Sequence, residues 1–223
     1  MWHEYPDIPP CIDALSRHIA THMAAVLENA GECSVAVSGG RSPIPLFERL
    51  ATADLDWTRV RLRLVDERFV PPGDPDSNET LVRRHLLTGK AADADFQGLY
   101  LPNASINEAV AAANEDARPV QLAILGMGDD GHTASLFPDA PQLDAALAPD
   151  AAHYLHVTPA QAPHERITMS LAALRACGRL VLYLSGQHKR NVLEEAGKKI
   201  SKTLPVSYLA AEPGATLDVY WHP

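Results

Sequence analysis

The chain has 223 residues, of which 46% are hydrophobic, and this length fits one domain with a full core. The formal net charge of -9 disfavours nucleic acid as a general partner, because an acidic surface repels phosphate backbones. The N-terminal segment lacks the basic and apolar regions of a secretory signal, and no apolar run approaches the roughly 20 residues that cross a bilayer.

The first half of the chain alternates predicted helices and strands. Apolar residues recur at helical spacing over residues 10–28, and Gly31 follows as a stop signal. The run "CSVAVSGG" predicts a short buried strand, and Pro43 begins a helix over 43–50. The run "RVRLRLVDERFV", residues 59–70, predicts one strand with two different faces. A helix over 77–87 follows, with Ser77 as its N-cap.

The second half continues the alternation. It predicts a helix over 106–117, an apolar strand over 120–128, a short strand at "YLHVTP" and a strand start leading into a helix over 166–177. The clearest buried strand is "GRLVLYLSG", followed by a helix over 188–197, and "LDVYWHP" closes the chain as an edge strand. This pattern predicts a single α/β domain over residues 1–223 with a largely parallel sheet, whose ligands sit beyond the carboxyl ends of the strands.

Four of these strand ends carry polar clusters. "SGGRSP", from Ser38 to Pro43, offers glycine backbone and hydroxyl groups to an anion, although an ordinary strand-to-helix turn would look the same. Asp66 and Arg68 end the next strand, either as site residues or as a structural ion pair. Arg166 and Lys189 follow later strands and could complete a phosphate pocket, or lie as solvated surface charges.

The segment "LGMGDDGHTASLFP" crowds Asp130 and His132 onto a glycine-rich bend after an apolar strand. A carboxylate next to a histidine can fix its tautomer and raise its basicity, which favours general base catalysis over a buried structural histidine. Metal binding is not expected, because the other histidines lack ligand spacing. The cysteines Cys11, Cys33 and Cys177 form no CxxC pair, so we expect reduced thiols in a cytoplasmic protein.

In this order, "VSGGRSP", "VDERFV" with "DSN", "LGMGDDGHTASLFP", "ERIT" and "SGQHK" resemble the 6-phosphogluconolactonase family over residues 37–189. The resemblance implies a modified Rossmann-like three-layer fold, shared with glucosamine-6-phosphate deaminase and ribose-5-phosphate isomerase. It implies hydrolysis of 6-phospho-D-glucono-1,5-lactone in the pentose phosphate pathway without metal or cofactor. One departure precedes Arg166, where His164 and Glu165 stand and the acid would weaken the phosphate field.

The resemblance also assigns the site residues. By the resemblance, His132 and Arg68 are catalytic, and the substrate-binding group comprises Ser38, Gly39, Gly40, Arg41, Ser42, Arg166 and Lys189. We add Asp130 and Asp66 as further catalytic candidates from their places beside His132 and Arg68. As a hypothesis, His132 takes a proton from water attacking the lactone carbonyl, Asp130 orients the imidazole, and Arg68 or backbone amides stabilise the oxyanion. No GxSxG nucleophile motif is present.

Two alternatives use the same fold. A sugar-phosphate isomerase or deaminase would carry a glutamate five residues after the histidine, where this chain has Phe137. A non-catalytic sugar-phosphate sensor would keep the Ser-Gly-Gly turn and could lose the His132–Asp130 pair. The expected partner is the small sugar-phosphate lactone, with no nucleic acid and no membrane, and the chain is expected to be a monomer or a homodimer.

Overall fold

The computed structural model describes residues 1–212 and 217–223, and its centre is a seven-stranded sheet in the order β1-β10-β9-β6-β2-β3-β5. All neighbouring strands of this sheet run parallel. The inner strands are almost wholly buried, as expected for a parallel sheet covered on both faces. The strands are β1 (Trp2–Glu4), β2 (Cys33–Val37), β3 (Val60–Leu64), β5 (Asp95–Phe96), β6 (Leu122–Leu125), β9 (Leu180–Ser185) and β10 (Leu217–His222).

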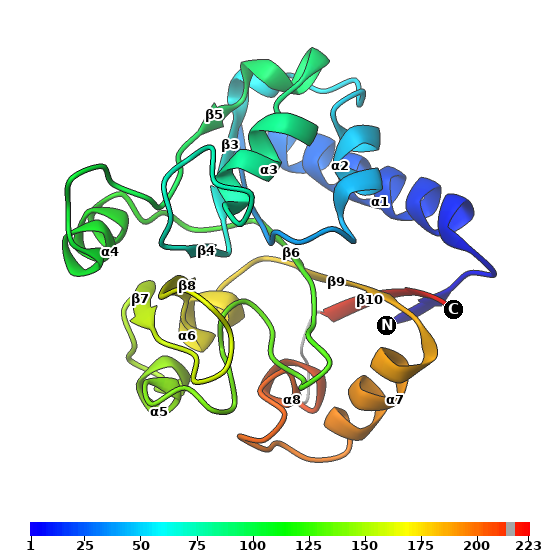
Figure 1. The fold of residues 1–223 in the computed structure, drawn as a ribbon. Helices are drawn as coiled ribbons and strands as arrows, with labels where there is room; N and C mark the ends of the chain where they lie inside the picture. The colour runs from blue at the N-terminus through cyan, green and yellow to red at the C-terminus, as the bar shows by residue number, and fades with distance from the viewer. Residues whose placement is uncertain (213–216) are drawn as a thin grey trace.

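Helices cover both sides of this sheet, so the predicted three-layer α/β architecture is confirmed (Figure 1). Helices α1 and α2 lie on one side of the strands, and α6, α7 and α8 lie on the other (Figure 1). The helices are α1 (Ile8–Ala30), α2 (Ile44–Leu50), α3 (Asn78–His85), α4 (Ile106–Glu115), α5 (Leu143–Leu147), α6 (Leu171–Arg175), α7 (Gln187–Ala196) and α8 (Ser207–Ala210), with short 3₁₀ turns at Trp57–Arg59 and Gly89–Asp93.

The predicted strand over 59–70 is wrong, because the chain changes sheets in its middle. Val65 donates its N–H to Val37 in the large sheet, and its carbonyl accepts from Met169 in the other direction. The following residues form β4 (Asp66–Arg68) in a second, antiparallel sheet with β8 (Arg166–Met169) and β7 (Tyr154–Val157). Alternating side chains cannot show such a change of partner, since both halves keep extended backbone.

The predicted edge position of the last strand is also wrong. β10 lies between β9 and β1, and the N-terminal residues Trp2–Glu4 form the edge that the sequence reading assigned to β10. The N–H of Tyr5 continues this contact by donating to the carbonyl of Trp221. A strand of three residues carries too little periodicity to be predicted, so only its tertiary pairing shows it.

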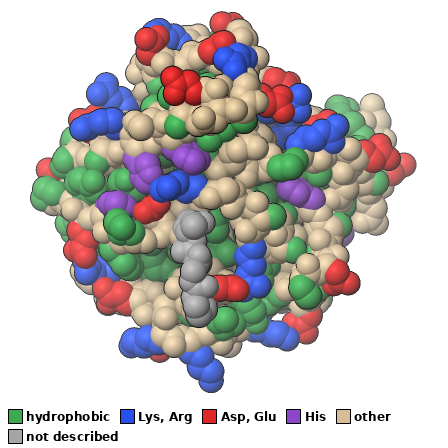
Figure 2. Space-filling model, turned by 180° about the vertical axis from the view of Figure 1, so that it is seen from behind, with side chains coloured by type: hydrophobic (Ala, Val, Ile, Leu, Met, Phe, Trp, Pro, Cys, Tyr) green, Lys and Arg blue, Asp and Glu red, His purple; other side chains and the backbone are tan. Residues whose placement is uncertain are grey.

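The helix end signals and the cysteines agree with their predictions. Gly31 ends α1 in the left-handed region with φ 84°, and the Ser77 hydroxyl caps α3 by accepting from the Thr80 N–H. The three cysteines are free and buried. Among the helices described, none is both long and apolar enough to span a membrane. Acidic and basic side chains are scattered over the face in Figure 2, where histidines also gather.

Candidate active site

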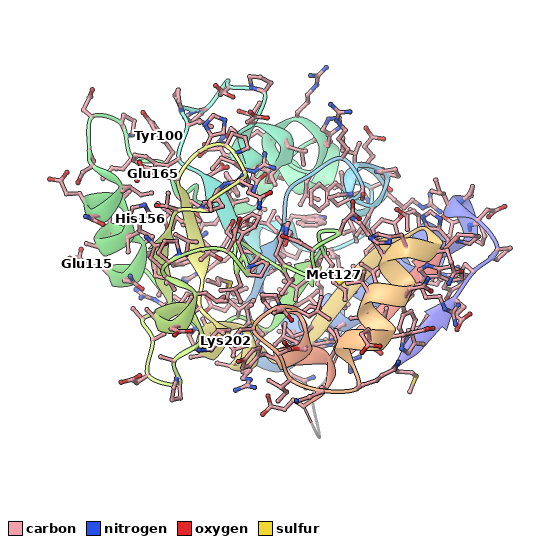
Figure 3. All side chains as sticks on the ribbon, turned by 60° about the horizontal axis from the view of Figure 1, so that its bottom comes forward. Tyr100, Glu115, Met127, His156, Glu165 and Lys202 are labelled. Carbon is pink, nitrogen blue, oxygen red and sulfur yellow. The ribbon has the colours of Figure 1, made fainter. Side chains whose placement is uncertain are left out.

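A pocket of about 300 Å³ opens where β2, β4, β6 and β9 end. Its walls carry four basic side chains and one carboxylate, so the local charge is opposite in sign to the net charge of the chain. Met127 contributes to its apolar surface and lies near the middle of the molecule in Figure 3. The charged and titratable lining residues are Arg41, Arg68, Arg166, Lys189, Asp66 and His132.

The turn after β2 forms one wall of the pocket with Ser38, Gly39, Gly40, Arg41 and Ser42. Gly40 has φ 96°, a conformation that L residues rarely adopt, so glycine is required for this bend. The N–H of Ser38 is used by the carbonyl of Ile124, whereas its buried hydroxyl oxygen has no hydrogen-bond partner among the described residues. A buried hydroxyl facing a pocket in this way is available to a polar ligand.

His132 and Asp130 form a hydrogen-bonded pair beside the pocket. The Asp130 Oδ1 atom lies 2.5 Å from the ring Nδ1 of His132 and also accepts the backbone N–H of His132 at 3.1 Å. Gly131 has φ 75°, which bends the chain enough to bring the two side chains together. A methyl group on Gly128 would overlap the imidazole, so glycine is needed there for close approach.

This pair sets the tautomer of the imidazole. An ionised carboxylate only accepts hydrogen bonds, so in the neutral imidazole Nδ1 carries the proton and Nε2 keeps its lone pair. Burial opposes ionisation of Asp130, but hydrogen bonds from the ring and backbone of His132 outweigh it and lower the pKa of Asp130. The Phe137 ring packs 4.1 Å from the His132 ring, centroid to centroid, and restrains it from the other side. The unprotonated Nε2 atom is therefore suited to accept a proton.

The short strand β4 brings Asp66 and Arg68 to the pocket, and they do not form an ion pair. Asp66 Oδ2 accepts from the Ser135 hydroxyl at 2.6 Å, which ties β4 to the bend that carries His132. Arg68 Nη1 donates to the carbonyl of Asp76 and, within the part of the chain described, reaches no carboxylate of Asp66 or Glu67. Its charge is therefore free to act on a ligand.

Glu67 points into the interior and is 0% exposed. Burial raises the pKa of Glu67 to about 7, against the opposing effect of three backbone N–H donors from Asn78, Glu79 and Arg68. With the Ser77 hydroxyl, these donors occupy both carboxylate oxygens, so Glu67 supports the wall of the pocket from behind.

Arg166 lies directly across from Arg68 in the β4–β8 pairing, and both border the pocket. The backbone carbonyls of Pro163 and His164 hold its guanidinium, which lies 5.6 Å from the centre of the Phe137 ring. Burial, followed by the nearby positive charge of Arg68, lowers the pKa of Arg166. An anion between the two arginines would relieve their repulsion.

Glu165 points away from this site. Its carboxylate pairs with His156 at 2.9 Å, and the two residues lie together away from Met127 in Figure 3. The carboxylate of Glu165 is thus paired with His156 and does not line the pocket, and its effect on the phosphate field stays a prediction.

The structure brings ten of the eleven predicted site residues to the pocket lining, and Asp130 lies behind His132 as its partner. Sequence reasoning missed Asn78, Tyr183, Ser185 and Phe137 as lining residues. Asn78, Phe137 and Ser185 belong to the quoted segments "DSN", "LGMGDDGHTASLFP" and "SGQHK", so their membership of these segments was the available signal. Across residues 1–212 and 217–223, no group of three potential metal ligands comes together, and the expectation of a metal-free site stays a prediction.

Comparison with known proteins identifies the family. A family model described as "Glucosamine-6-phosphate isomerases/6-phosphogluconolactonase" matches residues 7–221. The chain is 40% identical to a Pseudomonas aeruginosa protein named 6-phosphogluconolactonase, over 94% of this chain and 89% of that protein. The chain belongs to this glucosamine-6-phosphate isomerase/6-phosphogluconolactonase family. A Neisseria meningitidis family member of the same name is 36% identical over 99% of this chain and 98% of that protein.

Solved structures of the family share the fold over the whole chain. The 6-phosphogluconolactonase from Shewanella baltica superposes with a TM-score of 0.93 at 32% identity, covering 100% of this chain and 97% of that one. The enzyme from Thermotoga maritima gives a TM-score of 0.83 at 26% identity, with 100% and 98% coverage. The family's α/β architecture is thus present in full.

Proposed function

We propose that this protein hydrolyses 6-phospho-D-glucono-1,5-lactone to 6-phospho-D-gluconate in the oxidative pentose phosphate pathway. The observation that carries the proposal is the His132–Asp130 pair at the edge of a pocket with four basic side chains. This combination offers a proton acceptor and an anion site within one cavity. The names of its relatives support the same reaction.

In the proposed mechanism, His132 Nε2 takes a proton from a water molecule as that water attacks the lactone carbonyl. Asp130 holds the ring and stabilises the imidazolium that forms. The carbonyl becomes a tetrahedral oxyanion, which then collapses with cleavage of the bond from C1 to the ring oxygen. His132 returns the proton to that departing oxygen, so the imidazole ends the cycle neutral.

Other lining residues stabilise charge and hold the substrate in this proposal. Arg68, or a backbone amide of the pocket, stabilises the oxyanion, a contribution of about 3 kcal/mol for a typical donor. The turn from Ser38 to Ser42, with Arg166 and Lys189, binds the phosphate. Binding at the phosphate keeps the lactone in register with His132. Asp66 acts through the Ser135 hydroxyl by holding the catalytic bend against β4.

The test is a proton-release assay with freshly generated lactone, corrected for its spontaneous hydrolysis. Wild-type protein is expected to accelerate acid release, and His132→Ala serves as the matched control for contaminating activity. A wild-type rate equal to the spontaneous rate would reject the proposal. Binding without turnover in a calorimeter would instead favour the sensor, and release of ammonia from glucosamine 6-phosphate would favour the deaminase.

We further propose that the protein acts in the cytoplasm as a monomer or a homodimer, with the lactone as its small-molecule partner. Its three free, buried cysteines support a reducing compartment. Burial keeps these thiols protonated by raising their pKa, to about 12 for Cys177. Size-exclusion chromatography with light scattering distinguishes the two oligomeric states.

A further inference from the structure

Asn78 contacts two segments that border the candidate active site, strand β4 and the turn after β2. Its backbone N–H donates to Glu67 Oε1 at 2.7 Å, and its side-chain Nδ2 donates to the carbonyl of Asp66 at 2.8 Å. The residue is 2% exposed and lines the pocket. As the first residue of α3, it links that helix to β4 through both backbone and side chain.

Glu67 fixes the position of Asn78 from the interior. Its Oε1 atom accepts the N–H groups of Arg68 and Asn78, and its Oε2 atom accepts the N–H of Glu79 and the hydroxyl of Ser77. One buried carboxylate therefore holds the first turn of α3 and the backbone of Arg68 together. Such a fully bonded buried group strongly restricts movement of the elements it joins.

The side chain of Asn78 also limits how closely the turn after β2 can approach α3. A methyl group on Gly39 would overlap the side-chain amide of Asn78. Gly39 has no positive φ, in contrast to Gly40, so its backbone conformation does not itself require glycine. The missing side chain at position 39 is explained by the space that Asn78 occupies.

We propose that Asn78 is a positioning residue that sets the separation between the Ser38–Ser42 turn and the strand carrying Arg68. The proposal rests on the proposed function, in which the turn holds the phosphate and Arg68 serves the reacting carbonyl. One rigid lactone must reach both groups at once, so an error in their separation weakens binding and misplaces the carbonyl.

A double-mutant cycle with Gly39→Ala and Asn78→Ala tests this coupling. Each single change is expected to lower kcat/KM roughly 10-fold or more, because small displacements of positioning groups have large effects. The new methyl of Gly39→Ala fits once the amide of Asn78 is removed. The double variant should therefore be no less active than Asn78→Ala alone. If the losses of kcat/KM in the two single variants multiply in the double variant, the two residues act independently and the proposal is overturned.

Gly126→Ala is the matched control, because a methyl there meets nothing within 4 Å and Gly126 also lines the pocket. Its effect on kcat/KM should be the same factor in the wild-type and Asn78→Ala backgrounds. Thermal unfolding checks that each variant is folded at the assay temperature. If Asn78→Ala does not fold, Asn78→Ser replaces it, since the serine hydroxyl can turn away from the new methyl.

The same double-mutant cycle is repeated with the affinity for 6-phosphogluconate, measured by calorimetry, in place of kcat/KM. This measurement does not depend on hydrolysis, so it tests the role of Asn78 separately from the proposed reaction. Wild-type protein that binds 6-phosphogluconate without hydrolysing the lactone would reject the hydrolysis, and the binding cycle would still decide the role of Asn78. Independent effects of the two changes on binding would reject that role. Wild-type protein with neither activity would reject both.

Discussion

Two histidines of this molecule, His132 and His18, lie in hydrogen-bonded clusters that include a carboxylate, and their surroundings differ. The Nδ1 atom of His132 is hydrogen-bonded to Asp130, and its Nε2 atom has no hydrogen-bond partner among the described residues. His18 of α1 has both ring nitrogens engaged, with Nδ1 2.5 Å from the Tyr220 hydroxyl and Nε2 3.1 Å from Arg179 Nη1. Arg179 in turn pairs with Asp218 at 2.7 Å.

The difference shows what makes a histidine suited to catalysis. Because an arginine only donates, Nε2 of His18 accepts and no lone pair remains for a substrate. In His132 one nitrogen is fixed by a carboxylate and the other borders a pocket. A general base therefore needs both a carboxylate bonded directly to one ring nitrogen and an open second nitrogen next to a cavity, and His18 has neither.

Removing each imidazole in turn tests most directly whether His132 is catalytic and His18 is not. His132→Ala should lower kcat by at least about 100-fold, the lower end of what general acid–base catalysis contributes, with little change in 6-phosphogluconate affinity. His18→Ala should leave kcat unchanged. Steady-state kinetics with the lactone measures both, and near-full activity in His132→Ala would reject it as the base.

Replacing Asp130 and Asp218 should give a smaller difference in kcat between the two clusters. Asp130→Asn should lower kcat roughly 10- to 100-fold, because an amide can donate to Nδ1 and stabilise the wrong tautomer. Asp218→Asn affects only the ion pairs of Asp218 with Arg179 and His3, so its kcat should match wild type. Equal losses of kcat in the two variants would contradict the separate roles.

Lys189 and Arg179, the basic side chains near the two histidines, should differ in their effect on substrate binding. Lys189→Ala should raise KM roughly 10- to 100-fold, the equivalent of one hydrogen bond between charged groups, while kcat changes little. Arg179→Ala removes a cation that does not line the pocket, so KM should stay at the wild-type value. An unchanged KM in Lys189→Ala would remove this lysine from the phosphate site.

The smallest expected effect is on stability at acid pH. Burial lowers the pKa of His18, with Asp218 opposing this shift and Arg179 adding to it. The unfolded chain, whose histidines titrate near pH 6.5, then binds protons more readily than the folded one. The free energy of unfolding should fall as pH drops below about 6.5.

His18→Gln should make that fall less steep, because glutamine does not titrate yet can still accept from Arg179. Urea unfolding between pH 5 and 7.5 measures the slope, and the same change at the exposed His188 is the control. An identical slope in wild type and His18→Gln would show that His18 does not contribute.

Much of the fold and site was predictable because the signals are local. Apolar runs locate the inner strands, Gly31 and Ser77 mark helix ends, and the parallel sheet follows from their alternation. Since parallel strands end at one edge, the polar residues after β2, β3, β6 and β9 were expected to meet there, whereas Arg166 reaches the pocket from the antiparallel sheet. The Asp130–His132 pair was predictable for the same reason, since both lie on one tight bend.

The α/β class, the helix ends and the edge of the sheet where polar residues gather can be predicted from the residues alone, because short-range periodicity and turn residues encode them. The change of sheets at Val65, the pairing of β1 with β10 and the position of Asn78 beside Gly39 emerge only from the folded chain. These features depend on contacts between residues far apart in the chain. Such contacts are selected by packing and hydrogen-bond satisfaction and leave no periodic mark along the chain.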